Sequence, residues 1–279
     1  MKNRFLILLS FVLIVGRDVV CANTSMVRER ININRDWRYQ IDDPDGVGAA
    51  LHYSRLKPYL LPCANDFIIF GKRYQRPEGN PGENIAYVKS DFDDSEWRHL
   101  NLPHDWAIEG PFNIDYNGST GKLPYWGIRW YRKTLELSQD DAGKQIYLDI
   151  DGAMSYVSVW CNGQYVGGWP YGYASFRLDL TPYIKAGQKN VLAIRLDNPD
   201  DTSRWYPGSG IYRNVWLVKT SPVHVEQWGT FVRNQQVDSE IAVMEMGVNI
   251  ENHAGKDVQV KLQTSVYLQG KDGRPAGEE

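Results

Sequence analysis

Apolar and polar residues alternate along several short stretches of the chain. In residues 144–150 the alternate positions 146, 148 and 150 are Ile or Leu, and in residues 175–180 the apolar positions are Phe and Leu. A period of two places alternate side chains on one face of a β-strand. Further strand-like runs lie at 32–40, 131–137, 156–161, 191–196 and 215–218. No long helical period stands out, so the pattern predicts an all-β fold.

Turn signals separate these stretches. Asn162-Gly163 follows the run 156–161, and both residues of such a pair adopt positive φ in a tight hairpin. Residues 42–90 are irregular and rich in Pro and Gly, and they predict an ordered surface excursion with several buried apolar side chains: Leu60, Leu61, Phe67, Ile68, Ile69 and Phe70. Short strands joined by turns predict a jelly-roll β-sandwich over residues 28–222.

Ser221-Pro222 predicts a domain boundary, because the strand pattern restarts after it. An immunoglobulin-like sandwich needs about seven strands and about 100 residues. We therefore predict that residues 223–279 form a truncated immunoglobulin-like β-sandwich, with Asn252 beginning a hairpin connection. Its expected strands are fewer than seven and lie at 223–227, 230–233, 241–251 and 257–268.

The first 22 residues have the pattern of a secretory signal peptide. Lys2 and Arg4 precede an apolar run over residues 5–15, and Val20-Cys21-Ala22 places small or medium residues before a cut at Asn23. The segment is too short to span a bilayer permanently. We expect export to the periplasm or the medium, with no membrane association after cleavage. Lipid attachment at Cys21 stays open as the alternative.

Composition narrows the function classes. The net charge is −3, which argues against a nucleic-acid partner. No Cys/His pair has metal-ligand spacing, so no metal and no cofactor is expected. Cys63 and Cys161 remain after cleavage. They can bridge in an oxidising compartment, although Cys161 in an alternating run fits a small buried side chain equally well.

The loop at 197–213 concentrates groups suited to a sugar or another planar polar ligand. It carries Arg204, Trp205, Tyr206, Tyr212 and Arg213 between two apolar runs. Guanidinium groups and flat aromatic faces on a loop held by two strands favour ligand binding. In the alternative interpretation, Trp205 and Tyr206 cap the sandwich end and Arg213 pairs with a carboxylate.

Four motifs carry a family resemblance. They are Leu-Pro-His-Asp-Trp at 102–106, Gly-Ile-Arg-Trp-Tyr-Arg-Lys at 127–133, Val-Trp-Cys-Asn-Gly at 159–163 and Arg-Trp-Tyr-Pro-Gly-Ser-Gly-Ile-Tyr-Arg at 204–213. In their residues and in their order along the chain, these motifs resemble the N-terminal sugar-binding domain of glycoside hydrolase family two, over about residues 30–222. The chain is similar to the N-terminal part of a bacterial β-galactosidase of that family. The resemblance implies a galactose-binding-domain-like jelly roll and a carbohydrate partner.

The resemblance also implies site residues. The polar residue before the Trp of the first motif reaches the sugar in that family, which points to Asp105. In the alternative, Asp105 only fixes its own turn. Arg204 and Trp205 are the other expected sugar ligands. Arg204 stands where a well-studied branch has a carboxylate that helps to hold a monovalent ion, so the ion is not carried over. His104 lacks a nucleophile partner, which favours a supporting role.

No catalytic residue is assigned in this chain. Glycoside hydrolysis usually needs two carboxylates flanking the scissile bond. In the resembling family both are Glu residues of a C-terminal barrel, which is missing here, and Glu83 and Glu109 lie in loops without a recognisable partner. The leading interpretation is the N-terminal part of an exported glycosidase, inactive alone. The alternatives are a free-standing carbohydrate-binding module and a structural protein of the cell envelope.

Overall fold

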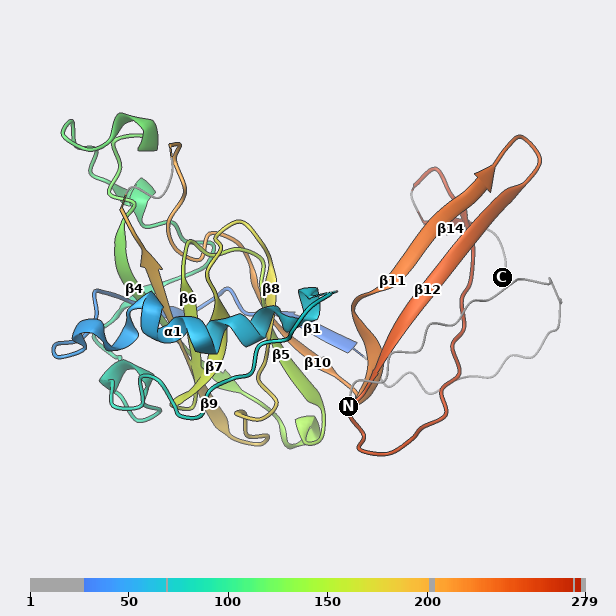
Figure 1. The fold of residues 1–279 in the computed structure, drawn as a ribbon, viewed down its shortest axis with the longest axis horizontal. Coiled ribbons are helices and arrows are strands. Elements are labelled where there is room, and N and C mark those ends of the chain that lie inside the picture. The colour runs from blue at the N-terminus through green and yellow to red at the C-terminus, as the bar shows by residue number, and fades with distance from the viewer. Residues whose placement is uncertain (1–27, 69, 201–203, 273, 277–279) are drawn as a thin grey trace. The chain divides into compact units, whose positions relative to one another are not determined.

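The computed structural model describes residues 28–68, 70–200, 204–272 and 274–276. The expected signal peptide and Cys21 lie outside these residues. Two compact units form, one ending at Ser221 and the other beginning at Pro222 (Figure 1). Among the described residues, no helix is long and apolar enough to cross a membrane.

The first unit is built on two antiparallel sheets, which confirms the predicted all-β sandwich. One sheet has four strands in the order β1-β10-β5-β8, and the other has six in the order β3-β2-β4-β9-β6-β7. The four-stranded sheet contains β1 (Arg28–Asn32), β5 (Gln145–Ile150), β8 (Phe176–Asp179) and β10 (Val215–Thr220). The six-stranded sheet contains β2 (Trp37–Ile41), β3 (Arg98–Leu100), β4 (Gly127–Glu136), β6 (Val157–Cys161), β7 (Gln164–Trp169) and β9 (Lys189–Asn198).

The run at 32–40 was predicted as one strand, and this is wrong. Asp36 adopts a φ of 60°, and the chain crosses there from β1 in one sheet to β2 in the other. The hairpin at Asn162-Gly163 is confirmed, since these residues have φ values of 52° and 78°. Cys161 is fully buried at the end of β6, and burial raises the pKa of its thiol to about 12. Cys63 is half-buried, and both residues are thiols.

The six-stranded sheet is buried on both faces. Tyr131 and Ile194 point into the core between the sheets, whereas their neighbours Trp130 and Ala193 belong to a second apolar cluster. Successive side chains of a strand point to opposite faces, so β4 and β9 each supply both clusters. This explains why a two-residue period is hard to see in the sequence of these strands.

A cover made from the excursion near residues 43–97 buries the outer face. It contains α1 (Tyr53–Leu60), which the sequence did not predict and whose Leu56 and Leu60 are buried. Among the predicted buried residues, Leu60 is therefore confirmed. Phe67 and Phe70 are 52% and 92% exposed, which contradicts the prediction, and nothing in the structure explains the exposed Phe70. Short 3₁₀-helices are η1 (Gly48–Leu51), η2 (Leu61–Phe67), η3 (Ala86–Val88), η4 (Ala107–Glu109), η5 (Gly118–Thr120) and η6 (Gln139–Asp141).

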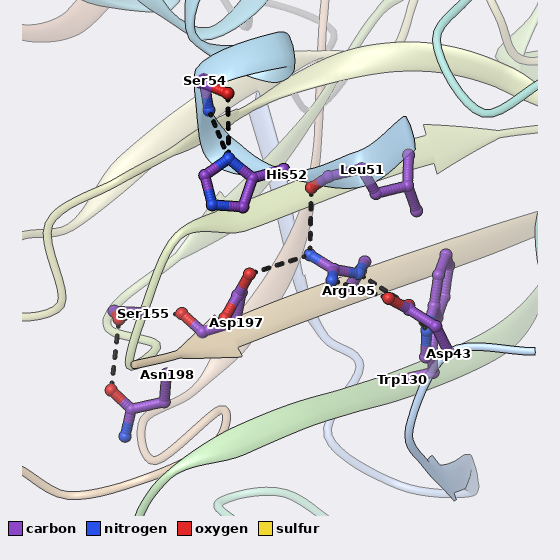
Figure 2. A network of polar contacts seen from close by, with 9 residues as sticks. All are labelled: Asp43, Leu51, His52, Ser54, Trp130, Ser155, Arg195, Asp197 and Asn198. Atoms are coloured by element: carbon purple, nitrogen blue, oxygen red, sulfur yellow. Dashed lines mark hydrogen bonds and ion pairs between the residues drawn. The ribbon is translucent and has the colours of Figure 1, made fainter. Parts of the chain in front are cut away.

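A buried ion pair ties this cover to the sheet (Figure 2). Both oxygens of Asp43 accept hydrogen bonds of 2.8 Å from the Arg195 guanidinium. The Trp130 indole also donates to Asp43, over 2.8 Å. Arg195 reaches the Leu51 carbonyl and Asp197 over 3.4 Å. A two-point carboxylate–guanidinium pair fixes geometry as well as charge, so this network sets the position of the cover on β4 and β9.

The second unit is a long hairpin with a short strand pair. The predicted strands at 223–227 and 230–233 are one strand, β11 (Val223–Val237), which pairs with β12 (Ala242–Asn252) and shifts register between Val225 and Thr230. The predicted strand at 257–268 is wrong, because residues 253–267 lie in no strand. The next strand after β12 is β13 (Leu268–Gln269), which pairs with β14 (Pro275–Ala276). The immunoglobulin-like assignment and the domain limits stay predictions.

Candidate functional site

Three segments far apart in the sequence meet at one end of the sandwich. The amide of His104 donates to the carbonyl of Ile211 over 2.9 Å. Met154 and Gly210 exchange backbone hydrogen bonds of 2.9 and 3.1 Å. Gly210 has a φ of +100°, and a Cβ there would lie 2.5 Å from the His104 carbonyl oxygen. Only glycine allows this approach, so Gly210 is where the motif at 102–106 meets the loop at 204–213.

Asp105 sits at this junction and contacts the loop directly. One carboxylate oxygen accepts a 3.0 Å hydrogen bond from the amide of Ala107. The other accepts from the hydroxyl of Tyr206. Burial raises the pKa of Asp105, and the Tyr206 hydrogen bond acts in the opposite direction. Asp105 therefore fixes its own turn and joins it to the loop, so the turn-forming role that the sequence left open is present.

His104 is the buried neighbour of Asp105 in the same turn. It is buried, with Nδ1 2.7 Å from the Tyr131 hydroxyl and Nε2 3.2 Å from Glu109. Burial lowers its pKa, while the carboxylate of Glu109 raises it. Arg98 donates two 2.7 Å hydrogen bonds to Glu109 and holds the pKa of that carboxyl below its usual range. Glu109 thus has partners that the sequence did not reveal. The two contacts of the His104 ring, with Tyr131 and Glu109, fit a supporting role for His104.

The base of the loop is held by a buried amide. Asn198 donates to the carbonyl of Tyr125 over 2.8 Å and to that of Gly208 over 3.2 Å. It accepts from the Ser155 hydroxyl over 3.2 Å (Figure 2). The Ser209 hydroxyl also donates to Tyr125, over 2.6 Å. These contacts hold residues 198 and 208 together and fix the base of the loop.

The outer part of the loop is open to solvent. Arg204 is exposed, and 58% of Trp205 is exposed. The Trp205 indole donates to the Tyr173 hydroxyl over 2.9 Å. Tyr206 instead packs against the sandwich core. The alternative in which both aromatic residues cap the sandwich therefore describes Tyr206 and not Trp205. The structure brings Asp105 to Tyr206, with Trp205 and Arg204 next along the same loop.

The arrangement offers hydrogen-bond acceptors, donors and an aromatic face, and no metal cluster. Among the described residues, no group of three or more His, Cys, Asp or Glu side chains could hold a metal ion. Sequence reasoning missed Tyr206 as the partner of Asp105, Asn198 as the loop anchor and Tyr173 as the neighbour of Trp205. Asn198 stands before Pro199 at the end of an apolar run, which was the one signal of an anchored turn.

Comparisons with known proteins identify the family of the chain. Residues 86–221 match the family described as glycosyl hydrolases family 2, sugar binding domain. The chain is 40% identical over 263 residues to a beta-galactosidase of Bacteroides ovatus, covering 92% of this chain and 26% of that protein. It is 35% identical over 209 residues to a putative beta-glucuronidase of Formosa agariphila, covering 71% of this chain and 20% of that protein.

A solved structure shows the same fold. The crystal structure of a beta-glycosidase from Bacteroides vulgatus is 30% identical with a TM-score of 0.63, and the match covers 89% of this chain and 27% of that chain. The chain spans about a quarter of the length of the first relative, with 26% of that protein covered. From these matches and the two-sheet fold, the chain belongs to glycosyl hydrolase family 2 and carries the sugar-binding domain of that family.

Proposed function

We propose that this chain is the N-terminal part of an exported glycoside hydrolase of β-galactosidase type. In this proposal Asp105, Arg204 and Trp205 bind the non-reducing sugar, and hydrolysis belongs to a C-terminal catalytic barrel that this chain does not contain. The observation that carries the proposal is the meeting of Asp105 with the 204–213 loop through Tyr206. The export part rests on the charged and apolar pattern of residues 1–22.

The chemistry of the three side chains supports a sugar ligand. A carboxylate offers about four acceptor positions, and charge-assisted hydrogen bonds to hydroxyls are stronger than neutral ones. Arg204 supplies donors that can bond sugar oxygens, and Trp205 supplies a flat apolar surface. Few precisely placed polar groups beside an aromatic face are typical of small-molecule sites. The beta-galactosidase relative, at 40% identity, favours a galactoside over a glucuronide.

Binding by the 279-residue chain tests the proposal. Methyl β-galactoside and methyl β-glucuronide are titrated while tryptophan fluorescence or amide NMR shifts are recorded. We expect the galactoside to bind more tightly. Asp105→Ala should weaken it about ten- to a hundredfold, because a charge-assisted hydrogen bond contributes about 1.5–3 kcal/mol. Arg204→Ala should act likewise, with little change in Tm.

Asp93→Ala is the matched control, because Asp93 accepts a 3.0 Å hydrogen bond from the amide two residues later, as Asp105 does. If Asp105→Ala behaves like Asp93→Ala in both Tm and affinity, Asp105 only shapes its turn and the proposed role fails. Tighter binding of the glucuronide would replace the galactosidase assignment.

A carbohydrate-binding module without catalysis is the second candidate, since the matched family segment is itself a sugar-binding domain. The two differ in what the intact gene product does. A purified full-length product that hydrolyses nitrophenyl β-galactoside, together with a 279-residue chain that does not exceed the buffer blank, supports the enzyme. A full-length product that binds galactosides without turnover supports the module.

A further inference from the structure

Three exposed aromatic side chains form a continuous ledge beside the candidate site. Tyr171, Tyr173 and Trp205 are 58%, 43% and 58% exposed. The rings of Tyr171 and Tyr173 are 5.6 Å apart with an angle of 64° between their planes. The Trp205 indole donates to the Tyr173 hydroxyl over 2.9 Å. The ledge therefore runs from the 204–213 loop onto the connection between β7 and β8.

The backbone under this ledge is fixed by packing. A Cβ on Gly172 would lie 2.2 Å from the Met154 sulfur, so the turn that carries both tyrosines presses directly on Met154. The Tyr212 hydroxyl donates to the Gly172 carbonyl over 2.7 Å. Met154 is in turn paired with Gly210 at the site. Rings held on a fixed turn lose little freedom when a ligand stacks on them.

The ledge is connected to Asp105 through the loop. Tyr206 bonds Asp105, Trp205 is its neighbour in the sequence, and the Trp205 indole donates to Tyr173. We propose that Tyr171 and Tyr173 form a second sugar subsite, one sugar unit beyond the one held by Asp105, so that the ligand is a disaccharide or a longer oligosaccharide. This inference rests on the proposed function and specifies its substrate class.

The chemistry of the ledge fits a pyranose ring. The apolar C–H face of a sugar covers an aromatic ring, while its hydroxyls meet polar edges. Tyr and Trp provide both, an apolar body and a polar tip. Exposed apolar side chains elsewhere on the sandwich, such as Phe112 and Ile114, which are 73% and 81% exposed, lack such tips. A protein surface packing on the ledge is the competing occupant and becomes an outcome of the test.

The experiment compares one sugar with two. The 279-residue chain is titrated with methyl β-galactoside and with β-1,4-galactobiose. We expect the disaccharide to bind about five- to tenfold more tightly. Tyr171→Ala and Tyr173→Ala should bring that ratio to about one and leave methyl β-galactoside affinity unchanged. Tyr173→Phe keeps the ring and should retain most of the ratio. Tyr74→Ala, at a side chain that is 47% exposed outside the ledge, is the matched control.

The outcomes separate the two proposals. If methyl β-galactoside binds but the wild-type ratio is about one, or if the ratio survives both alanine variants, the second subsite is wrong and the proposed function stands. If neither sugar binds, the proposed function fails, and the subsite with it. Concentration-dependent self-association that Tyr171→Ala abolishes, with no change in the sugar ratio, assigns the ledge to a protein contact and overturns the subsite. Thermal melting of each variant confirms that it is folded.

Discussion

Asp43 and Asp105 are two half-buried aspartates of the sandwich, and their hydrogen-bond partners differ in charge. Asp43 is half-buried between the cover and the six-stranded sheet, and Arg195 and Trp130 donate hydrogen bonds to its oxygens. Asp105 is half-buried at the end of the sandwich, and its bonds come from one backbone amide and one tyrosine of a projecting loop. The guanidinium of Arg195 pairs with Asp43, whereas the hydrogen bonds to Asp105 come from an amide and a hydroxyl, which are neutral donors.

This difference in partners distinguishes a carboxylate with a structural role from one that is suited to bind a ligand. Pairing with the guanidinium of Arg195 compensates the loss of hydration of Asp43, whereas for Asp105 the effect of burial outweighs its hydrogen bonds and raises its pKa. A fully paired buried charge is costly to break. Because burial disfavours the ionised form of Asp105, hydrogen bonds from the hydroxyls of a ligand would stabilise that form. The predictions below test this contrast, beginning with the largest effect.

Removing the scaffold carboxylate should have the largest effect. Asp43→Ala leaves Arg195, whose side chain is only 4% exposed, without its two-point partner. Breaking a buried pair in this way costs about 3–5 kcal/mol, which urea unfolding will measure. The control is Asp42→Ala, because Asp42 is 75% exposed and its oxygen lies 3.6 Å from Arg129. If both variants lose the same free energy of unfolding, the pair of Asp43 with Arg195 does not have the structural role described.

A smaller loss is expected at the junction of the site. Gly210→Ala should destabilise the fold by about 1–3 kcal/mol, because it adds a strained φ and a Cβ 2.5 Å from the His104 carbonyl oxygen. Gly143→Ala isolates the backbone part, since Gly143 has a φ of +79° with nothing within 4 Å. Methyl β-galactoside affinity should also fall only in Gly210→Ala. If the two variants match in stability and affinity, the close approach at Gly210 does not position the site.

Sugar affinity should depend on the ionisation of Asp105. Because burial raises its pKa, affinity should fall at a higher pH on acidification than it would for an exposed aspartate, whose pKa is about 3.9. The sign for stability is the reverse of the usual one. Between the unfolded and the raised folded pKa, the native state binds more protons, so stability falls as pH rises through that window. Asp105→Asn should abolish the loss of affinity on acidification and remove the Asp105 contribution to the pH dependence of stability, as seen when binding and melting are compared with wild type between pH 4 and 7. A wild-type affinity that is constant over this range contradicts the ligand role.

The smallest effect is expected at Glu109. Its pKa is lowered chiefly by the hydrogen bonds from Arg98, so the stabilisation is present above the unfolded pKa and is lost as pH falls through the depressed folded pKa. The pair is partly exposed, with side chains 52% and 39% accessible, so Glu109→Gln should cost less than about 1 kcal/mol at neutral pH. Chemical denaturation at pH 7 and at pH 4 measures it. Glu136→Gln, at a 3.7 Å pair that is mostly exposed, should cost less. A larger loss at Glu136 would contradict the assignment.

The sequence reveals strands where one face alone carries apolar residues. Residues 144–150 alternate clearly, and β5 lies where that alternation predicts it. It does not reveal α1, because this short helix contains Pro58 and buries only Leu56 and Leu60. A helix of that length depends on tertiary packing for its stability. The crossing at Asp36 is hidden for a similar reason, because it depends on which sheet each neighbouring strand joins.

The candidate site was predictable in its residue types and not in its contacts. Arg204, Trp205 and Tyr206 stand out as unusual loop residues, and the motif at 102–106 marks Asp105. Their meeting depends on Gly210 approaching the His104 carbonyl, a contact between segments about a hundred residues apart. Neither composition nor periodicity encodes such a contact, so the Tyr206–Asp105 bond appears only in three dimensions.

The pairing of β1 with β10 has a consequence for the order of folding. Arg28 lies opposite Thr220, so the four-stranded sheet is completed by the first and last strands of the unit. Contacts of such large sequence separation require an entropic cost of loop closure before they stabilise the chain, and they slow folding. During synthesis, β1 has no partner until β10 has left the ribosome. The two ends also lie side by side, so a circular permutant that joins residues 28 and 220 and opens a surface turn should keep the sandwich.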